Sequence, residues 1–188
     1  SLHDALPIFV FGQPPIENIQ RTAQIENIIS TFTAEQPSNY INIITGIRGC
    51  GKTVFLTEIA ERLGDQNGWV VVNLNPKRDL LVSLAAKLES NNSLRGIFEE
   101  LHINLQAFGI GIGINGGHPI SDIEEAISRI LKGLKKHGKR LLITIDEAGN
   151  SNEMRIFASA YQIFLRERLP VFLLMTGLHK NISRLRNA

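Results

Sequence analysis

The chain has 188 residues, of which 43% are hydrophobic and 20% are charged, and its formal net charge is +2. This size and balance favour one folded domain with a substantial core, and they exclude two full domains and a disordered or fibrous chain. So small an excess of positive charge does not by itself indicate a nucleic-acid-binding protein. The single cysteine excludes an internal disulfide framework and favours a reducing cytoplasm, and no apolar run approaches the roughly 20 residues that span a bilayer.

The first eight residues read SLHDALPI, which resembles a translated sequencing adapter. They lack the positive, apolar and cleavage regions of a signal peptide. We therefore expect residues 1–8 to be non-native. After the turn FGQPP, residues 16–32 place apolar side chains at helical spacing, which predicts the first helix.

Two pairs of a strand and a helix follow. The short apolar runs YINIIT, at 40–45, and WVVVNLN, at 69–75, are typical of buried strands. The first strand leads to a helix over 52–63, with Gly64 as its stop. The second leads to a helix over 80–88, for which Asp79 is placed as the N-terminal cap.

The pattern changes between residues 96 and 117, where INLQAFGIGIGINGG alternates apolar residues with glycine. This period of two predicts an extended segment or a hairpin inserted into the main scheme. Ser121 and Glu124 then form a capping box, which predicts the start of an amphipathic helix. Gly138 follows the last apolar residues of that helix and predicts its end.

Two further strands are predicted, RLLITIDE at 140–147 and PVFLLMTG at 170–177. Between them lies a helix that Asn150 or Ser151 caps and that runs to about Arg168. Strands that are apolar on both faces, alternating with amphipathic helices, predict a three-layer α/β fold with a mainly parallel sheet. Ligands bind at the carboxyl ends of the strands in such sheets, so the loops there should carry the chemistry.

The loop after the first strand reads GIRGCGKT and satisfies the pattern GxxxxGK[ST] between a strand and a helix. Glycines let consecutive backbone N–H groups turn inward around a phosphate. Lys52 would bring a positive charge to the β- and γ-phosphates, and the Thr53 hydroxyl would bind Mg²⁺. The segment is therefore predicted to hold a nucleoside triphosphate. Its predicted binding residues are Gly46, Ile47, Arg48, Gly49, Cys50, Gly51, Lys52, Thr53 and Val54.

An acidic pair ends the third predicted strand. Mg²⁺ at a phosphate loop needs a carboxylate in its surroundings, and Asp146 supplies one at the end of LLITIDE. Glu147 follows directly and would polarise the attacking water as a general base. We predict that Thr53 and Asp146 form the metal site and that Glu147 and Lys52 are catalytic.

These motifs resemble those of P-loop ATPases of the AAA+ and STAND group, and most closely those of bacterial Orc1/Cdc6-like AAA ATPase domains. The matching segments are GIRGCGKT, VVVNLN, LLITIDEAG and VFLLMTG, and the resemblance covers roughly residues 12–188. It implies ATP and Mg²⁺ as ligands, and hydrolysis coupled to conformational switching of a DNA or protein complex, with oligomers forming on ATP binding. It also implies that Thr176 is the sensor-1 residue, which contacts the γ-phosphate or the water.

The same resemblance implies a sheet order 5-1-4-3-2 whose fifth strand lies outside this chain. Residues 9–188 would then be an ATPase domain truncated before its C-terminal lid. Residues 11–15 could line the base, whereas Arg21 lacks the glycine that precedes the corresponding arginine of the family.

Other functions remain open on the sequence. A small-molecule kinase or a GTPase uses the same loop, although no NKxD guanine motif is present and Glu147 favours transfer to water. A DNA-binding loader module, in which nucleotide is structural, is the non-enzymatic alternative. Cys50 is either a redox handle, because a helix N-terminus lowers a thiol pKa, or a small residue that fits the loop.

Overall fold

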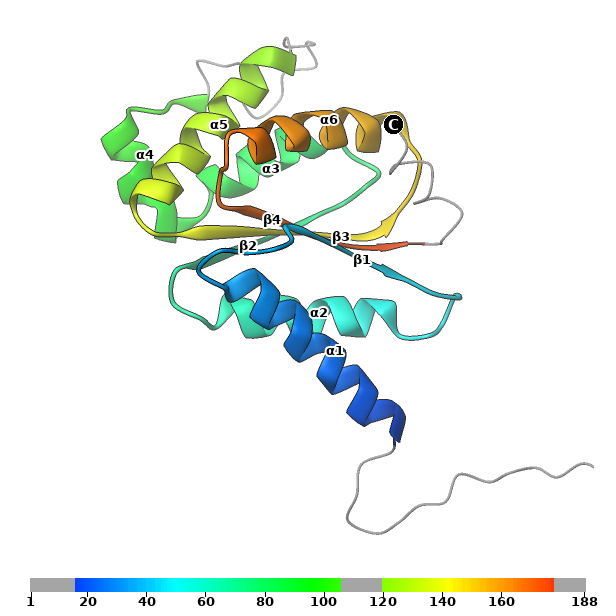
Figure 1. Cartoon of the computed structure of the whole chain (residues 1–188). Helices are drawn as coiled ribbons and strands as arrows, with labels where there is room; N and C mark the ends of the chain where they lie inside the picture. Colours follow the sequence, from blue (N-terminus) through cyan, green and yellow to red (C-terminus); the bar gives the residue numbers. More distant parts are fainter. Residues whose placement is uncertain (1–15, 106–119, 178–188) are drawn as a thin grey trace, which may run out of the picture.

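The computed structural model describes residues 16–105 and 120–177 (Figure 1). Its four strands are parallel and form one sheet in the order β1-β4-β3-β2. This order agrees with the 1-4-3-2 part of the predicted sheet. The elements in chain order are α1 (Ile16–Thr33), β1 (Ile41–Thr45), α2 (Lys52–Gly64), β2 (Trp69–Leu74), α3 (Leu80–Glu89), a 3₁₀ turn (Asn92–Leu94), α4 (Arg95–Leu101), α5 (Ile120–Lys136), β3 (Arg140–Ala148), α6 (Asn152–Arg166) and β4 (Val171–Gly177).

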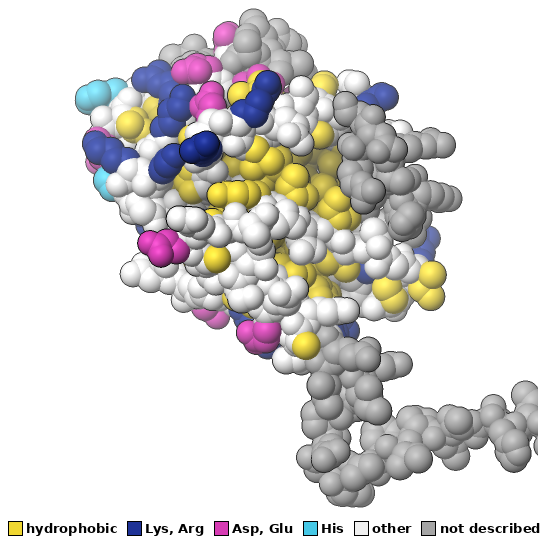
Figure 2. Space-filling model, viewed as in Figure 1, with side chains coloured by type: hydrophobic (Ala, Val, Ile, Leu, Met, Phe, Trp, Pro, Cys, Tyr) yellow, Lys and Arg dark blue, Asp and Glu magenta, His cyan; other side chains and the backbone are white. Residues whose placement is uncertain are grey.

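Helices cover both faces of the sheet, as the sequence predicts. In Figure 1, α1 and α2 lie on one face, and α3, α4, α5 and α6 lie on the other. Strand β4 is buried along its whole length because it pairs with β1 on one side and β3 on the other. Strand β1 is only partly buried, and Figure 2 shows apolar side chains gathered where this strand lies.

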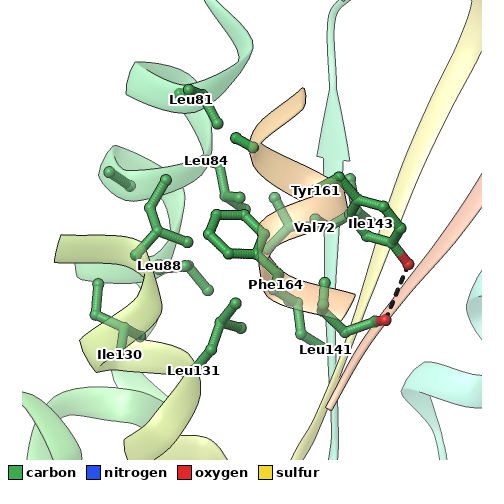
Figure 3. Packing of buried hydrophobic residues seen from close by; sticks show 14 of the residues in the cluster. Val72, Leu81, Leu84, Leu88, Ile130, Leu131, Leu141, Ile143, Tyr161 and Phe164 are labelled. Carbon is green, nitrogen blue, oxygen red and sulfur yellow. Dashed lines mark hydrogen bonds between the residues drawn. The ribbon is translucent and has the colours of Figure 1, made fainter. Parts of the chain in front are cut away.

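The larger core lies between the sheet and helices α3 to α6. Figure 3 shows Leu84, Leu88 and Phe164 meeting there, and all three side chains are fully buried. The hydroxyl of Tyr161 lies 2.9 Å from the carbonyl oxygens of both Tyr40 and Val171. Burial raises the pKa of this hydroxyl well above its usual range. Tyr161 thus ties α6 to the beginnings of β1 and β4.

The smaller core lies beneath the other face and positions α1 and α2. Phe172 on β4 is its centre, with the rings of Phe32, Tyr40 and Trp69 at 5.1, 5.0 and 5.1 Å between centroids. Such aromatic pairs stabilise by about 0.5–1.5 kcal/mol beyond the area that they bury. They fix α1 under the β1 edge, close to the loop that joins β1 to α2.

Side chains and glycines define the helix ends. Asp79 accepts a hydrogen bond from the Val82 N–H at 3.0 Å, so the predicted cap is confirmed. Ser151, rather than Asn150, caps α6 by accepting from the Met154 N–H at 3.2 Å. Gly138 has a φ of 63° after α5, and it ends that helix as predicted.

The roles predicted for Gly64 and Ser121 at two helix ends are wrong, although each end lies within two residues of the prediction. Gly64 is the last residue of α2 and has no left-handed φ, and Asp65 continues the right-handed conformation. The chain turns only at Gly68, whose φ is 91°. Helix α5 begins at Ile120, so Ser121 lies inside its first turn and does not precede it as the capping box requires.

Helix α4 (Arg95–Leu101) was not predicted, because the sequence analysis noted only a change of pattern from residue 96. It forms because it packs on α5. A Cβ at Gly133 would lie 2.8 Å from Ile97 and 2.5 Å from Leu101, so the missing side chain lets one face of α4 approach α5 closely. The alternating residues from Phe108 to Ile114 lie outside the described residues.

Candidate nucleotide-binding site

The predicted phosphate loop joins β1 to α2 at the carboxyl end of the sheet. Gly49 and Gly51 have φ values of 82° and 80°, which side chains other than glycine rarely adopt. A Cβ at Gly46 would lie 2.7 Å from the Cys50 sulfur, so this position also requires glycine. Gly51 precedes α2 without a side-chain cap, which leaves the first N–H groups of the helix available to an anion.

Lys52 folds back over this loop. Its ammonium group donates to the carbonyl oxygens of Gly46 at 3.1 Å and Ile47 at 2.7 Å, and it lies 3.9 Å from the Cys50 sulfur. Two backbone carbonyls therefore hold the Lys52 ammonium group against the loop. No described carboxylate forms an ion pair with it. Phosphate oxygens would be much stronger partners for this cation than carbonyl groups.

The predicted metal residues are in direct contact. The Thr53 hydroxyl donates to Oδ2 of Asp146 at 2.8 Å, across 93 positions of sequence. The hydroxyl of Thr176, at the end of β4, donates to the other oxygen, Oδ1. The carboxylate is thus fixed between the start of α2 and the end of β4.

Glu147 lies at an irregularity of β3. The pairing of β3 with β4 shifts register between Ile145 and Ala148, and Glu147 has a left-handed φ of 55°. Its N–H lies 2.9 Å from Thr176 Oγ1 and 3.0 Å from Asp146 Oδ1, and these contacts support the strained backbone. The side chain is exposed and lines a cleft of about 500 Å³ with Asn75 and Lys77.

Thr176 is fully buried. Its single hydroxyl proton is donated to Asp146, and its oxygen accepts from the Glu147 N–H. In this conformation the side chain therefore positions the two acidic residues, and the contact with a γ-phosphate or water stays a prediction.

The donor set fits a magnesium ion. A hydroxyl and a carboxylate are hard oxygen ligands, and Mg²⁺ is usually held by one or two protein groups together with substrate phosphates and waters. Within residues 16–105 and 120–177, no group of three or more His, Cys, Asp or Glu residues is placed to hold a metal ion. Thr53 and Asp146 would therefore act with the phosphates of a nucleotide.

The sequence analysis did not predict that Arg21 contacts the phosphate loop. Arg21, on α1, donates from Nη2 to the Gly51 carbonyl at 2.6 Å, and its guanidinium carbon lies 5.6 Å from the centroid of the Phe55 ring. The resemblance marks Arg21 only as the counterpart of a family arginine near the base, and its contact with Gly51 depends on how α1 packs beside α2. The segment predicted to line the base, residues 11–15, lies outside the described residues.

The remaining loop residues are exposed. Ile47 and Val54 are 79% and 61% exposed, which is exceptional for large apolar side chains among the described residues. Arg48 and Cys50 are also exposed. Their accessibility is compatible with contact to a nucleotide, and their binding roles stay predictions.

Residues 19–161 match the model of a family described as an ATPase domain predominantly from Archaea. The chain belongs to this family. The match confirms the prediction of an ATPase domain, and it includes the phosphate loop, Asp146 and Glu147. A search of curated proteins finds no match to this ATPase domain.

One solved structure shows the same fold. The crystal structure of Cdc6p from Pyrobaculum aerophilum is similar to this ATPase domain with a TM-score of 0.52 and 16% identity, over 97% of this chain and 43% of that chain. The Orc1 protein of Aeropyrum pernix, solved in complex with DNA, has a TM-score of 0.45 and 19% identity, over 97% of this chain and 44% of that chain. The fold is therefore the Cdc6-like one that the resemblance implied, and the chain spans less than half the length of either protein.

None of the helices that the structure describes combines the length and the apolar character that crossing a bilayer requires.

Proposed function

We propose that this ATPase domain binds ATP together with Mg²⁺ and hydrolyses it. The observation that carries the proposal is the junction at Asp146, where the phosphate-loop residue Thr53 and the β4 residue Thr176 both bond to one carboxylate. This junction holds the binding loop and the acidic pair in a single unit.

Each residue has a distinct task in the proposal. The loop amides and Lys52 bind the phosphates, and Thr53 and Asp146 hold the metal ion or its waters. Mg²⁺, when bound, neutralises charge on the phosphates. Glu147 accepts a proton from the attacking water, which its exposed carboxylate can reach from the neighbouring cleft.

The Glu147 carboxylate also favours transfer of the phosphoryl group to water rather than to a small-molecule acceptor. Glu147 has a left-handed backbone conformation, and its N–H donates to Asp146 Oδ1 and Thr176 Oγ1, so its backbone position is fixed relative to Asp146. We further propose, on the resemblance, that the nucleotide state switches the conformation of a DNA or protein complex.

The direct test measures ATP affinity and phosphate release for the wild-type chain and for Lys52→Ala. We expect the substitution to weaken ATP binding by about 100-fold, because it removes more than one charge-assisted hydrogen bond. Lys135→Ala is the matched control, since this exposed lysine also donates to a backbone carbonyl, that of Arg168, but lies near the start of β3, at the end of the sheet opposite the phosphate loop. Unchanged affinity in Lys52→Ala would overturn the proposed site.

A further inference from the structure

Basic residues gather at the amino end of the sheet, opposite the phosphate loop. The segment KGLKKHGKR, at 132–140, contains Lys and Arg but no acidic residue, and RER, at 166–168, adds two arginines. The first segment leads from α5 into β3, and the second leads from α6 toward β4. Because β3 and β4 are parallel neighbours, both segments lie at the same end of the sheet. Figure 2 shows Lys and Arg side chains gathered where Figure 1 places the ends of α5 and α6.

Direct contacts join the two segments. The Lys135 ammonium group donates to the carbonyl oxygen of Arg168 at 3.0 Å, and Lys132 forms an ion pair with Glu167 at 3.0 Å. The basic side chains of this region are exposed or partly exposed, and we call them the basic patch. Its members are Lys132, Lys135, Lys136, Lys139, Arg166 and Arg168.

The basic patch carries more positive charge than its acidic neighbours balance. Glu167 pairs with Lys132, and Glu100, on α4, pairs with Lys136 and His137. The other members form no ion pair with a described carboxylate; they are Lys135, Lys139, Arg166 and Arg168. The patch therefore keeps an excess of positive charge that faces solvent.

Arg168 occupies a backbone position that favours glycine. Its φ is 54°, in the left-handed region, and the N–H of the next residue, Leu169, donates to the Phe164 carbonyl. The end of α5 has the same pattern, but there the left-handed residue is Gly138, whose φ is 63°. A Cβ is unfavourable in this conformation, so glycine is usual at such helix ends. The fold does not explain an arginine here, whereas a role for its side chain on the surface does.

The composition of the basic patch indicates the kind of partner. Protein interfaces have an apolar centre and are depleted in lysine, and peripheral membrane surfaces insert apolar side chains. The exposed large apolar side chains among the described residues, Ile47 and Val54, lie at the phosphate loop instead. The patch also lacks the aromatic rings on which unpaired bases stack. Lys and Arg side chains without such groups suit the phosphate backbone of a duplex.

We propose that the basic patch binds the phosphate backbone of duplex DNA without reading its sequence. The inference goes beyond ATP hydrolysis, and it rests on the proposed function only where it makes DNA the partner whose complex is switched. The phosphate loop and the patch lie at opposite ends of the sheet, so nucleotide and DNA bind separate surfaces.

The test is fluorescence anisotropy of labelled duplex DNA, in two unrelated sequences, titrated with the 188-residue chain at several salt concentrations. We expect equal affinity for both sequences and a steep loss of affinity with added salt. The triple variant Lys139→Gln, Arg166→Gln and Arg168→Gln should bind about 30-fold more weakly, and its slope of log affinity against log salt should be shallower by about three.

Arg168→Gly separates binding from stability. Its melting temperature should equal or exceed that of the wild type, because glycine suits the left-handed position. The slope against salt should nevertheless become shallower by about one, the contribution of one phosphate contact. An unchanged slope would remove Arg168 from the proposed surface.

A second triple variant, Lys87→Gln, Arg95→Gln and Arg155→Gln, is the matched control. It removes the same charge from exposed sites on α3, α4 and α6 that lie outside the basic patch. We expect it to keep most of the DNA affinity, and both triple variants to bind ATP as the wild type does. Equal losses of DNA affinity in the two triple variants would overturn the inference.

Two outcomes for the wild-type chain also decide the matter. Binding to phosphatidylserine vesicles but not to the duplex would overturn the inference, and so would binding of ATP without any binding of the duplex. In that second case the proposed ATP site stands. Binding of the duplex without binding of ATP would instead overturn the proposed function and leave the basic patch as a DNA-binding surface.

Discussion

The phosphate loop and the acidic end of the site, which consists of Asp146 and Glu147, are built in different ways. The loop is local, since eight consecutive residues supply its glycines, its lysine and its threonine. The acidic end is assembled from residues far apart in the sequence, because Asp146 contacts Thr53 and Thr176 across 93 and 30 positions. Under the proposed function, nucleotide binding would therefore depend mainly on a short backbone conformation, whereas hydrolysis would depend on the register of β3 against β4.

This difference implies that binding and turnover can be separated by substitution. Changes within the loop should act on the affinity for nucleotide. Changes at the acidic end should act on the rate of hydrolysis or on the requirement for Mg²⁺, with little effect on affinity.

The largest effect is expected for Glu147→Gln. Removing a general base lowers turnover by about 10²–10⁴-fold, while the loop and Lys52 keep their contacts and ATP affinity stays within about twofold. Phosphate release and ATP titration measure the two quantities. Glu153→Gln, an exposed substitution in the first turn of α6, should leave both unchanged. Undiminished hydrolysis in Glu147→Gln would remove this residue from its role.

A smaller effect is expected for Thr176→Val, which keeps the shape of the side chain but removes its hydroxyl. Oδ1 of Asp146 then loses a donor and the Glu147 N–H loses one acceptor. We expect the Mg²⁺ concentration for half-maximal hydrolysis to rise about tenfold, as for the loss of one hydrogen bond to a charged group. Thr176→Ser should restore the wild-type requirement.

Thr144→Val is the matched control for that substitution, because Thr144 is also a buried threonine of the sheet but lies two residues before Asp146. Both valine variants alter buried hydroxyl groups, so their melting temperatures calibrate any general loss of stability. If the two variants need the same amount of Mg²⁺, Thr176 does not position Asp146.

The sequence was sufficient to predict the sheet, most helices and the candidate loop, because each depends on local pattern. Asp79 and Ser151 cap helices as their residue types suggest. Helix α4 was not predicted, since it depends on close packing against Gly133 on another helix.

The residues of the candidate site also fall into two groups, those that a local motif reveals and those whose contacts depend on tertiary structure. Lys52 and Thr53 are recognisable from the loop motif. The structure shows Thr53 in contact with Asp146, and the role of this pair at a metal ion stays a prediction. The arrangement of Thr176 on Asp146 and the left-handed Glu147 depend on a register shift that no sequence pattern marks. The contact of Arg21 with the loop likewise depends on tertiary packing.

The smallest effect separates two glycines of the loop. Gly49 and Gly51 have nearly the same φ, 82° and 80°, so an alanine at either position carries a similar backbone strain of about 1–2 kcal/mol. A Cβ at Gly49 meets no atom within 4 Å, whereas one at Gly51 meets the Arg21 guanidinium. We therefore expect Gly51→Ala to weaken ADP binding about threefold more than Gly49→Ala, because it also displaces Arg21, whose hydrogen bond to the Gly51 carbonyl helps to hold the loop.

Titrations in an Arg21→Met background isolate the cause of that difference. With the guanidinium group absent, the Cβ at Gly51 has lost its close neighbour, and the two alanine variants should weaken ADP binding equally. A threefold difference that persists without Arg21 would show that Gly51 acts through the backbone alone. The loop would then owe its affinity entirely to local conformation, and α1 would contribute nothing to the binding of nucleotide.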